Sequence, residues 1–182
     1  MGKNCYLRGV AALVIALLSI SYSIAFSPWF NLLDNALSDL GDFSRSNVAY
    51  VFNFGLFLSG IFIVIYALID VLKFNSMLAY LMEIAGSFLL LIGILNESYG
   101  YIHFAVSAFF FASLALLLIA FSKIFKTAIP VLTCLFLIVL WIIHLSFDIP
   151  KGAAIPEILS IVSIVPWYLK LVKILCSNSV AC

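Results

Sequence analysis

Long apolar runs separated by short polar joints dominate the chain. Six runs approach or exceed the ~20 residues that an α-helix needs to cross a bilayer core of about 30 Å. They are Leu7–Phe26, Val48–Leu72, Met77–Leu95, Tyr101–Phe121, Ala128–Phe147 and Pro156–Leu175. The runs are apolar on all sides, without the strict alternation of membrane β-strands. The pattern therefore predicts six transmembrane helices.

The joints between these runs set the topology. Residues 73–76, 96–100, 122–127 and 148–155 form short connections, which favour antiparallel neighbours in an up-and-down bundle. We predict an all-α integral membrane bundle that forms a single domain over residues 1–182. Only the first connection, Ser27–Asn47, is long enough to carry structure of its own.

The first connection contains the pattern of a short amphipathic helix over Ser27–Gly41. Ser27 suits the helix cap, Pro28 the first turn and Gly41 the left-handed residue past the end. One predicted stripe holds Leu33, Leu37 and Leu40, and the opposite face holds Asn31, Asp34, Asn35, Ser38 and Asp42. This pattern is typical of an interfacial helix. It either closes the bundle or turns Ser38 and Asp39 inward over a site.

Composition supports the membrane assignment. Of 182 residues, 66% are hydrophobic and 9% are charged, and the mean hydropathy is +1.27. A soluble domain carries about 25% charged residues. These values exclude an ordinary soluble globule, a disordered tail and a nucleic-acid-binding domain. The partners expected from them are membrane lipids and other membrane-protein subunits.

The basic residues predict the orientation. One side of the predicted bundle holds Lys3, Arg8, Lys73, Lys123, Lys126, Lys170 and Lys173, and the other side holds Arg45 and Lys151. Because Lys and Arg accumulate on the cytoplasmic side, we expect both termini to be cytoplasmic in a multi-pass protein of the cell membrane.

The four cysteines do not form an evident framework. Cys5, Cys176 and Cys182 fall on the predicted cytoplasmic side, and Cys134 falls inside the fifth run. Disulfides are rare in a reducing compartment, so we expect free thiols.

Most ionisable side chains fall on the predicted outer side. Both histidines and six of the eight acids lie there: Asp34, Asp39, Asp42, Glu97, His103, His144, Asp148 and Glu157. His144 and Asp148 are four residues apart, which places them on one helix face. We expect His103, His144, Asp148 and Glu157 to be candidate ligands for zinc or another divalent metal. Ser38, Asp39, His103 and Glu157 are the candidate catalytic residues, since a metal-bound water there could attack a lipid headgroup.

Two other interpretations stay open for the same residues. Each group could simply cap a helix end or face water, as polar residues in loops usually do. Alternatively, His103 and His144 on adjacent spans could hold a haem or hydrogen-bond a quinone.

Two polar residues fall within apolar runs. Glu83 shares a predicted face with Ala79, Gly86 and Gly93, which would let a neighbouring helix approach closely. Asn53 and Gly60 are seven residues apart and predict a second packing face. We expect both Asn53 and Glu83 to be buried, with Glu83 serving either proton transfer or packing.

Several of these residues together resemble a known family. Asn35-Ala-Leu-Ser-Asp-Leu-Gly41, then Asn53-Phe-Gly55 and Gly60, resemble the prokaryotic six-span family known as domain of unknown function family 998. His103 and Glu157 match the His that opens span four and the Glu near the start of span six in that family. The resemblance implies a six-helix fold and points to Ser38, Asn53, His103 and Glu157, but it implies no activity.

The sequence thus favours a non-catalytic accessory subunit or a lipid-interacting helical bundle. The alternatives are a metal-assisted hydrolase acting on a lipid or lipid-linked group at the outer leaflet, and a quinone- or haem-linked membrane subunit. Whether the protein is an enzyme stays open at this point.

Overall fold

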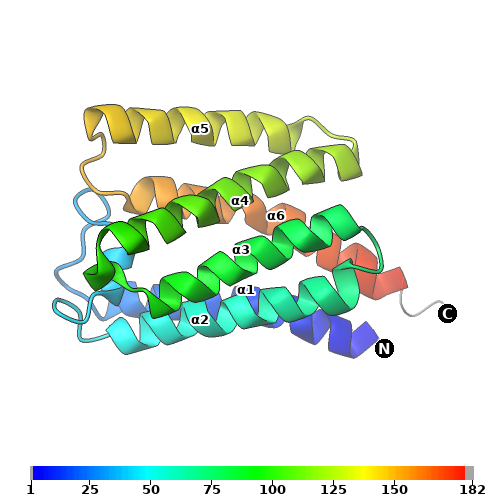
Figure 1. Cartoon of the computed structure of the whole chain (residues 1–182), viewed down its shortest axis with the longest axis horizontal. Coiled ribbons are helices and arrows are strands. Elements are labelled where there is room, and N and C mark those ends of the chain that lie inside the picture. The colour runs from blue at the N-terminus through cyan, green and yellow to red at the C-terminus, as the bar shows by residue number, and fades with distance from the viewer. Residues whose placement is uncertain (1, 179–182) are drawn as a thin grey trace.

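The computed structural model describes residues 2–178 and is helical throughout its regular elements (Figure 1). The elements are α1 (Gly2–Ala25), η1 (Leu37–Gly41), α2 (Ala49–Tyr66), η2 (Ala67–Val71), α3 (Ser76–Ile94), η3 (Glu97–Tyr99), α4 (Tyr101–Phe125), α5 (Ile129–Phe147) and α6 (Ala154–Asn178). The η1 and η3 segments are 3-10 helices, and η2 is a π-helical continuation of α2. In this part of the chain, six helices are long and apolar enough to cross a membrane, which confirms the predicted number of spans.

The helices alternate in direction, so the bundle has two distinct ends (Figure 1). We call the end that holds residues 26–48, 95–100 and 148–153 the loop end. The opposite end, where α1 begins and α6 ends, is the terminal end. Figure 1 shows α5 at the edge of the bundle, where it lies beside α4 and separates from it toward the loop end.

Local sequence signals define several helix boundaries. The side chain of Asn75 accepts a 2.9 Å hydrogen bond from the N–H of Leu78 and caps α3. Pro130 lies in the first turn of α5, where its missing N–H has no consequence. The helices α4 and α5 are followed directly by Lys126 and Asp148, which both adopt left-handed backbone conformations.

Glycines bring α2 and α3 into close contact. A Cβ atom on Gly60 would lie 2.6 Å from the carbonyl oxygen of Gly86, and one on Gly93 would lie 2.5 Å from that of Asn53. Such contacts allow helices to pack closely in a membrane, where burial of apolar surface gives little driving force. The predicted packing faces of both helices are thus confirmed. Asn53 is buried as expected, whereas Glu83 is only partly buried, because it lies at the border of the α3 packing face rather than at its centre.

Polar and covalent links join helices at the terminal end. Arg8 in α1 makes a two-pronged ion pair with Asp70 in η2, with both N–O distances at 2.7 Å. A disulfide joins Cys5 in α1 to Cys176 in α6. The prediction of free thiols at these two positions was therefore wrong. It rested on the expected compartment, whereas the pairing depends on α1 and α6 being neighbours. Cys134 is a free, buried thiol, and Cys182 lies outside the described residues.

The predicted interfacial helix over Ser27–Gly41 is not confirmed. The segment consists of turns followed by η1, and Leu37 and Leu40 are buried against the bundle instead of facing a membrane surface. Short polar side chains accept hydrogen bonds from backbone N–H groups that would otherwise bond within a helix. Asn31 accepts from the N–H of Leu33, and Asp39 accepts from that of Ala36. This local competition is the reason why such residues favour turns.

Candidate functional site

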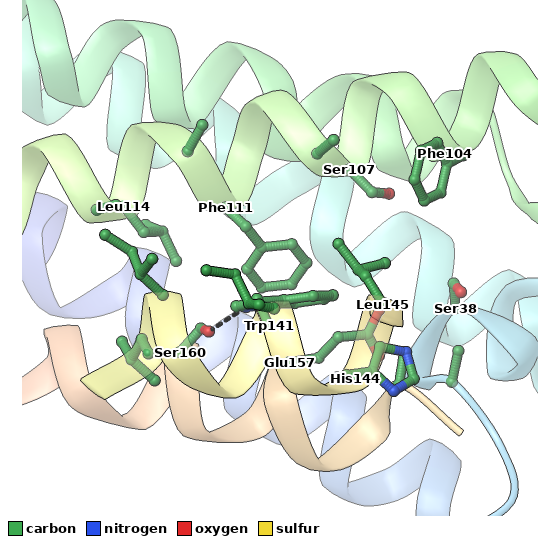
Figure 2. Close-up of a pocket in the computed structure, with 18 of the residues that line it drawn as sticks. Ser38, Phe104, Ser107, Phe111, Leu114, Trp141, His144, Leu145, Glu157 and Ser160 are labelled. Carbon is green, nitrogen blue, oxygen red and sulfur yellow. Dashed lines mark hydrogen bonds between the residues drawn. The ribbon is translucent and has the colours of Figure 1, made fainter. Parts of the chain in front are cut away.

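A cavity of about 430 Å³ lies between α4, α5 and α6 at the loop end (Figure 2). Its walls are mainly apolar and include Phe104, Phe111, Leu137, Trp141 and Leu145. The first connection, Ser27–Asn47, is called the first loop from here on. Its residues Ala36 and Ser38, together with Glu97 of η3, complete the cavity near the loop end. The volume falls in the range of small-molecule sites, which usually combine apolar walls with a few placed polar groups.

Small side chains on α4 make room for the cavity. Ala108, Ala112 and Ala115 all line it, and their spacing of four and three residues places them along one helix stripe. Across the space, the rings of Phe111 and Trp141 pack with centroids 5.1 Å apart. The small side chains of this α4 stripe thus leave space beside the aromatic pair that joins α4 to α5.

The three helices each contribute a pair of polar-tipped side chains to the lining. The pairs are His103 and Ser107 on α4, Trp141 and His144 on α5, and Glu157 and Ser160 on α6. Each pair is three or four residues apart, so both members lie on one helix face. Across the cavity, the indole N–H of Trp141 donates to the Ser160 hydroxyl at 3.1 Å (Figure 2).

Glu157 lies in the first turn of α6 and connects the cavity to the first loop. Its side chain is about nine-tenths buried, and Oε2 accepts a 2.6 Å hydrogen bond from the backbone N–H of Leu37. The N–H groups of Gly152 and Ala154 donate to the carbonyls of Leu33 and Asn35, at 2.8 and 3.0 Å. The first loop is therefore held against the start of α6 by three hydrogen bonds.

Glycine at position 152 is required for this contact. A Cβ atom there would lie 2.2 Å from the carbonyl oxygen of Asn35, which is closer than real side chains come. The backbone of the first loop thus packs directly on the α5–α6 connection. This contact places Ala36 and Ser38 at the loop-end boundary of the cavity.

The end of the cavity where the histidine and glutamate side chains gather is called the polar end. His103 is buried there, in the first turn of α4. Its Nδ1 donates to the Leu95 carbonyl at 2.5 Å. Its Nε2 lies 3.3 Å from the Ser107 hydroxyl and 3.1 Å from Oε2 of Glu97. Both ring nitrogens therefore already have partners.

His144 has a similar anchor on α5. Its Nδ1 donates to the carbonyl of Pro150 at 2.8 Å, which connects the ring to the α5–α6 loop. The ring also packs edge-on against Trp141, with centroids 5.9 Å apart. The ring orientation is thus fixed by one hydrogen bond and one aromatic contact.

The structure brings together most of the predicted site residues. Ser38, His103, His144 and Glu157 all line the same cavity. Asp39 does not line it. Its carboxylate accepts from Asn35 and Ala36 and pairs with Arg45 at 3.2 Å, so Asp39 braces the first loop.

The predicted metal site is not assembled. Asp148 is exposed and does not line the cavity, because α5 ends at Phe147 and the left-handed conformation of Asp148 removes it from the face of His144. Within residues 2–178, no group of three His, Cys, Asp or Glu side chains is arranged to hold a metal ion. Metal binding by His103, His144, Asp148 and Glu157 stays a prediction that this arrangement does not support.

Sequence reasoning missed several cavity residues. The stripe of Ala108, Ala112 and Ala115 has a helical spacing that is visible in the sequence. The i, i+4 pair of His103 and Ser107 was another available signal. The pairing of Trp141 with Ser160 had no comparable signal, because it depends on how α5 and α6 pack.

Fold and site together define a multi-span helical membrane protein with a cavity between α4, α5 and α6. The model of the family described as Protein of unknown function (DUF998) matches residues 10–172, and the chain belongs to that family. The predicted resemblance is thereby confirmed. No curated protein and no solved structure matches the chain.

Proposed function

We propose that this protein binds a membrane lipid, with the lipid chain in the apolar part of the cavity and the headgroup at the polar end. The observation that carries this proposal is the composition of the cavity lining. Alanine, leucine, isoleucine and aromatic side chains form the walls, and histidine, serine and glutamate side chains gather toward the loop end. An amphipathic ligand matches this division.

The exposure of the lining residues supports entry from the bilayer. Phe104 and Leu145 are 61% and 64% exposed, although both belong to helices long and apolar enough to cross a membrane. In a bilayer, such side chains contact lipid chains. The cavity between α4 and α5 would then be continuous with the hydrocarbon region, so a lipid could enter without crossing water.

Filling the cavity tests the proposal. Ala112→Trp places an indole in the alanine stripe, whereas Leu116→Trp adds one at an exposed position of α4 that does not line the cavity. Each protein is purified in mild detergent, and bound lipid is measured by native mass spectrometry and by extraction. We expect lipid bound to wild type and to Leu116→Trp, and at least a tenfold loss in Ala112→Trp. Equal lipid content in the two variants would overturn the proposal.

Metal-assisted hydrolysis is less well supported by the arrangement. A histidine that ligates a metal must offer one ring nitrogen without another partner. Here Ser107 and Glu97 both approach Nε2 of His103, and Nδ1 is bonded to a backbone carbonyl. The same bonds leave no nitrogen of His103 free to ligate a haem.

An accessory role beside other membrane subunits stays a prediction. Its test is co-purification of defined partner chains after mild solubilisation. A protein that is monomeric and loaded with lipid under these conditions would favour the lipid-binding proposal alone.

The predicted orientation belongs to the same proposal. The Lys and Arg residues of the terminal end favour a cytoplasmic location for that end in a cell-membrane protein, and the cavity would then lie near the outer leaflet. In a variant without native cysteines, we expect Lys151→Cys to react with a membrane-impermeant thiol reagent on intact cells. Protection of that cysteine until the cells are lysed would contradict the orientation.

A further inference from the structure

We propose that the lipid bound in the cavity carries a cationic amine headgroup. This inference rests on the proposed lipid-binding function and adds the chemical class of the ligand. The argument depends on which hydrogen-bonding roles and charges remain available at the polar end.

The neutral ring of His144 presents an acceptor at the polar end. A carbonyl oxygen only accepts hydrogen bonds, so the contact to Pro150 places the hydrogen of this ring on Nδ1. Nε2 of His144 then carries a lone pair, whereas Nε2 of His103 already lies 3.1 Å from the Glu97 carboxylate. For His144, Nε2 makes no hydrogen bond to any residue in the described part of the chain, so this acceptor is available to a ligand.

Glu157 adds a second unused acceptor. Oε2 holds the N–H of Leu37, whereas no donor among residues 2–178 is hydrogen-bonded to Oε1. The side chain is only 7% exposed and has no ion-pair partner in this range. A buried carboxylate without a cation is costly, and a cationic ligand would offset that cost. Figure 2 shows Glu157, His144 and Ser38 at the same end of the cavity.

Among the described residues, the cavity lining does not contain the basic side chains that usually bind an anionic headgroup. Glu97 and Glu157 line the cavity, whereas no Lys or Arg does so among the described residues. Phosphate and carboxylate ligands are usually bound by Arg, Lys or free backbone N–H groups. The N–H of Ala154, at the start of α6, is already bonded to Asn35. Arg45 is paired with Asp39 and packs over Trp29.

A ligand series that varies only the headgroup tests the inference. Three probes share one brominated alkyl chain and carry an amine, an alcohol or a carboxylate. Bromine quenches tryptophan fluorescence, and Trp141 lines the cavity. Purified wild-type protein in neutral detergent is titrated with each probe, and Trp141→Phe identifies the quenching that comes from the cavity. We expect the amine to bind at least tenfold more tightly than the carboxylate.

Carboxylate variants then locate the recognition. In Glu157→Gln, the amide oxygen can still accept from Leu37, so we expect a folded protein with about tenfold weaker amine binding and unchanged alcohol binding. Glu97→Gln removes the other carboxylate of the lining from a more exposed position and provides a second variant should the first fail to fold. Glu83→Gln removes a carboxylate that does not line this cavity, and it should bind all three probes as wild type does.

The outcomes separate the two proposals. If no probe quenches Trp141, lipid binding in this cavity is wrong, and the headgroup inference falls with it. If the carboxylate binds as tightly as the amine, or if neither Glu157→Gln nor Glu97→Gln changes amine binding, the cavity binds lipids but the cationic headgroup is wrong.

Discussion

Glu157 in α6 holds the backbone N–H of Leu37, which lies 120 residues earlier in the chain, through a 2.6 Å hydrogen bond. This bond connects the η1 segment to the last of the six helices. It also places one carboxylate in two roles, because the same side chain lines the cavity. Position 157 therefore affects both the docking of the first loop and the chemistry of the polar end.

Removing the carboxylate should release the first loop. In Glu157→Leu, the buried N–H of Leu37 loses its acceptor, and an unpaired buried donor costs about 1–3 kcal/mol. We expect a loss of unfolding free energy in this range and faster amide hydrogen exchange over Leu37–Gly41. Glu157→Gln should lose less than half as much, since it keeps an acceptor. Unchanged exchange at Leu37 in Glu157→Leu would show that the bond does not hold the loop.

The effects of substitutions at Gly41 and Asn53 on the free energy of unfolding should be strongly coupled. The Asn53 amide donates to the Gly41 carbonyl at 2.8 Å, and a Cβ atom on Gly41 would lie 2.4 Å from Oδ1 of Asn53. We expect Asn53→Ala to cost about 1 kcal/mol through the lost bond. Gly41→Ala should be more costly in wild type than in the Asn53→Ala background, with a coupling energy of roughly 0.5–3 kcal/mol.

Gly100→Ala provides the control for this cycle. Gly100 has a φ of +54° and no atom near its absent Cβ, so its substitution acts through the backbone alone. Its effect on unfolding free energy should be the same with and without Asn53. If Gly41→Ala behaves in the same way, the close contact with Asn53 is not present in the folded protein.

The disulfide between Cys5 and Cys176 should be detectable by thiol labelling. Denatured protein should react at two more thiols after reduction than before it. Because the bond closes a loop of 171 residues between α1 and α6, we expect reduction to lower the stability by on the order of 2–4 kcal/mol. Cys134→Ser should leave the reduction-dependent change intact. Labelling that does not depend on reduction would exclude the bond.

The carboxylate of Asp42 should contribute a pH-dependent part of the stability. The N–H of Ser44 above all, and then the hydroxyls of Ser44 and Ser98 and the charge of Arg45, lower its pKa below the ordinary value of 3.8. A lowered pKa in the folded state stabilises above the unfolded pKa, and this contribution disappears as the pH falls through the folded pKa.

Acid unfolding of matched variants measures this contribution. In Asp42→Asn the unfolding free energy should fall less steeply below pH 3.8 than in wild type, and Ser98→Ala, which removes one donor, should lie between the two. If wild type and Asp42→Asn have the same pH dependence in this interval, the hydrogen bonds to Asp42 do not favour its ionised form in the folded protein.

The six helices could be predicted because each must cover the hydrocarbon thickness with apolar residues, a requirement that the sequence alone reveals. The structure of the first loop could not be predicted in the same way. Its Ser, Pro, Leu and Gly positions match an amphipathic helix, but Asn31 and Asp39 bond to nearby backbone N–H groups and stabilise turns. Gly41 is needed for its closeness to Asn53, and it does not adopt the left-handed conformation expected past a helix end.

The candidate site was predictable in part. The six-span topology alone predicts that four polar residues lie at one end of the bundle. All four line one cavity: Ser38, His103, His144 and Glu157. Asp148 does not line this cavity, because the i, i+4 relation with His144 holds only while the helix continues. The pairing of Cys5 with Cys176 depends on α1 packing beside α6, which run lengths do not specify.

The links between α1 and α6, and between the first loop and the start of α6, have a consequence for biosynthesis. The first helix and the loop behind it leave the ribosome long before their partners Cys176, Gly152 and Glu157 are made. Until α6 is inserted, the N–H of Leu37 lacks its acceptor and Cys5 lacks its partner. Insertion of α6 is thus the step that completes the bundle, and truncation before it would leave an open intermediate for quality-control proteases.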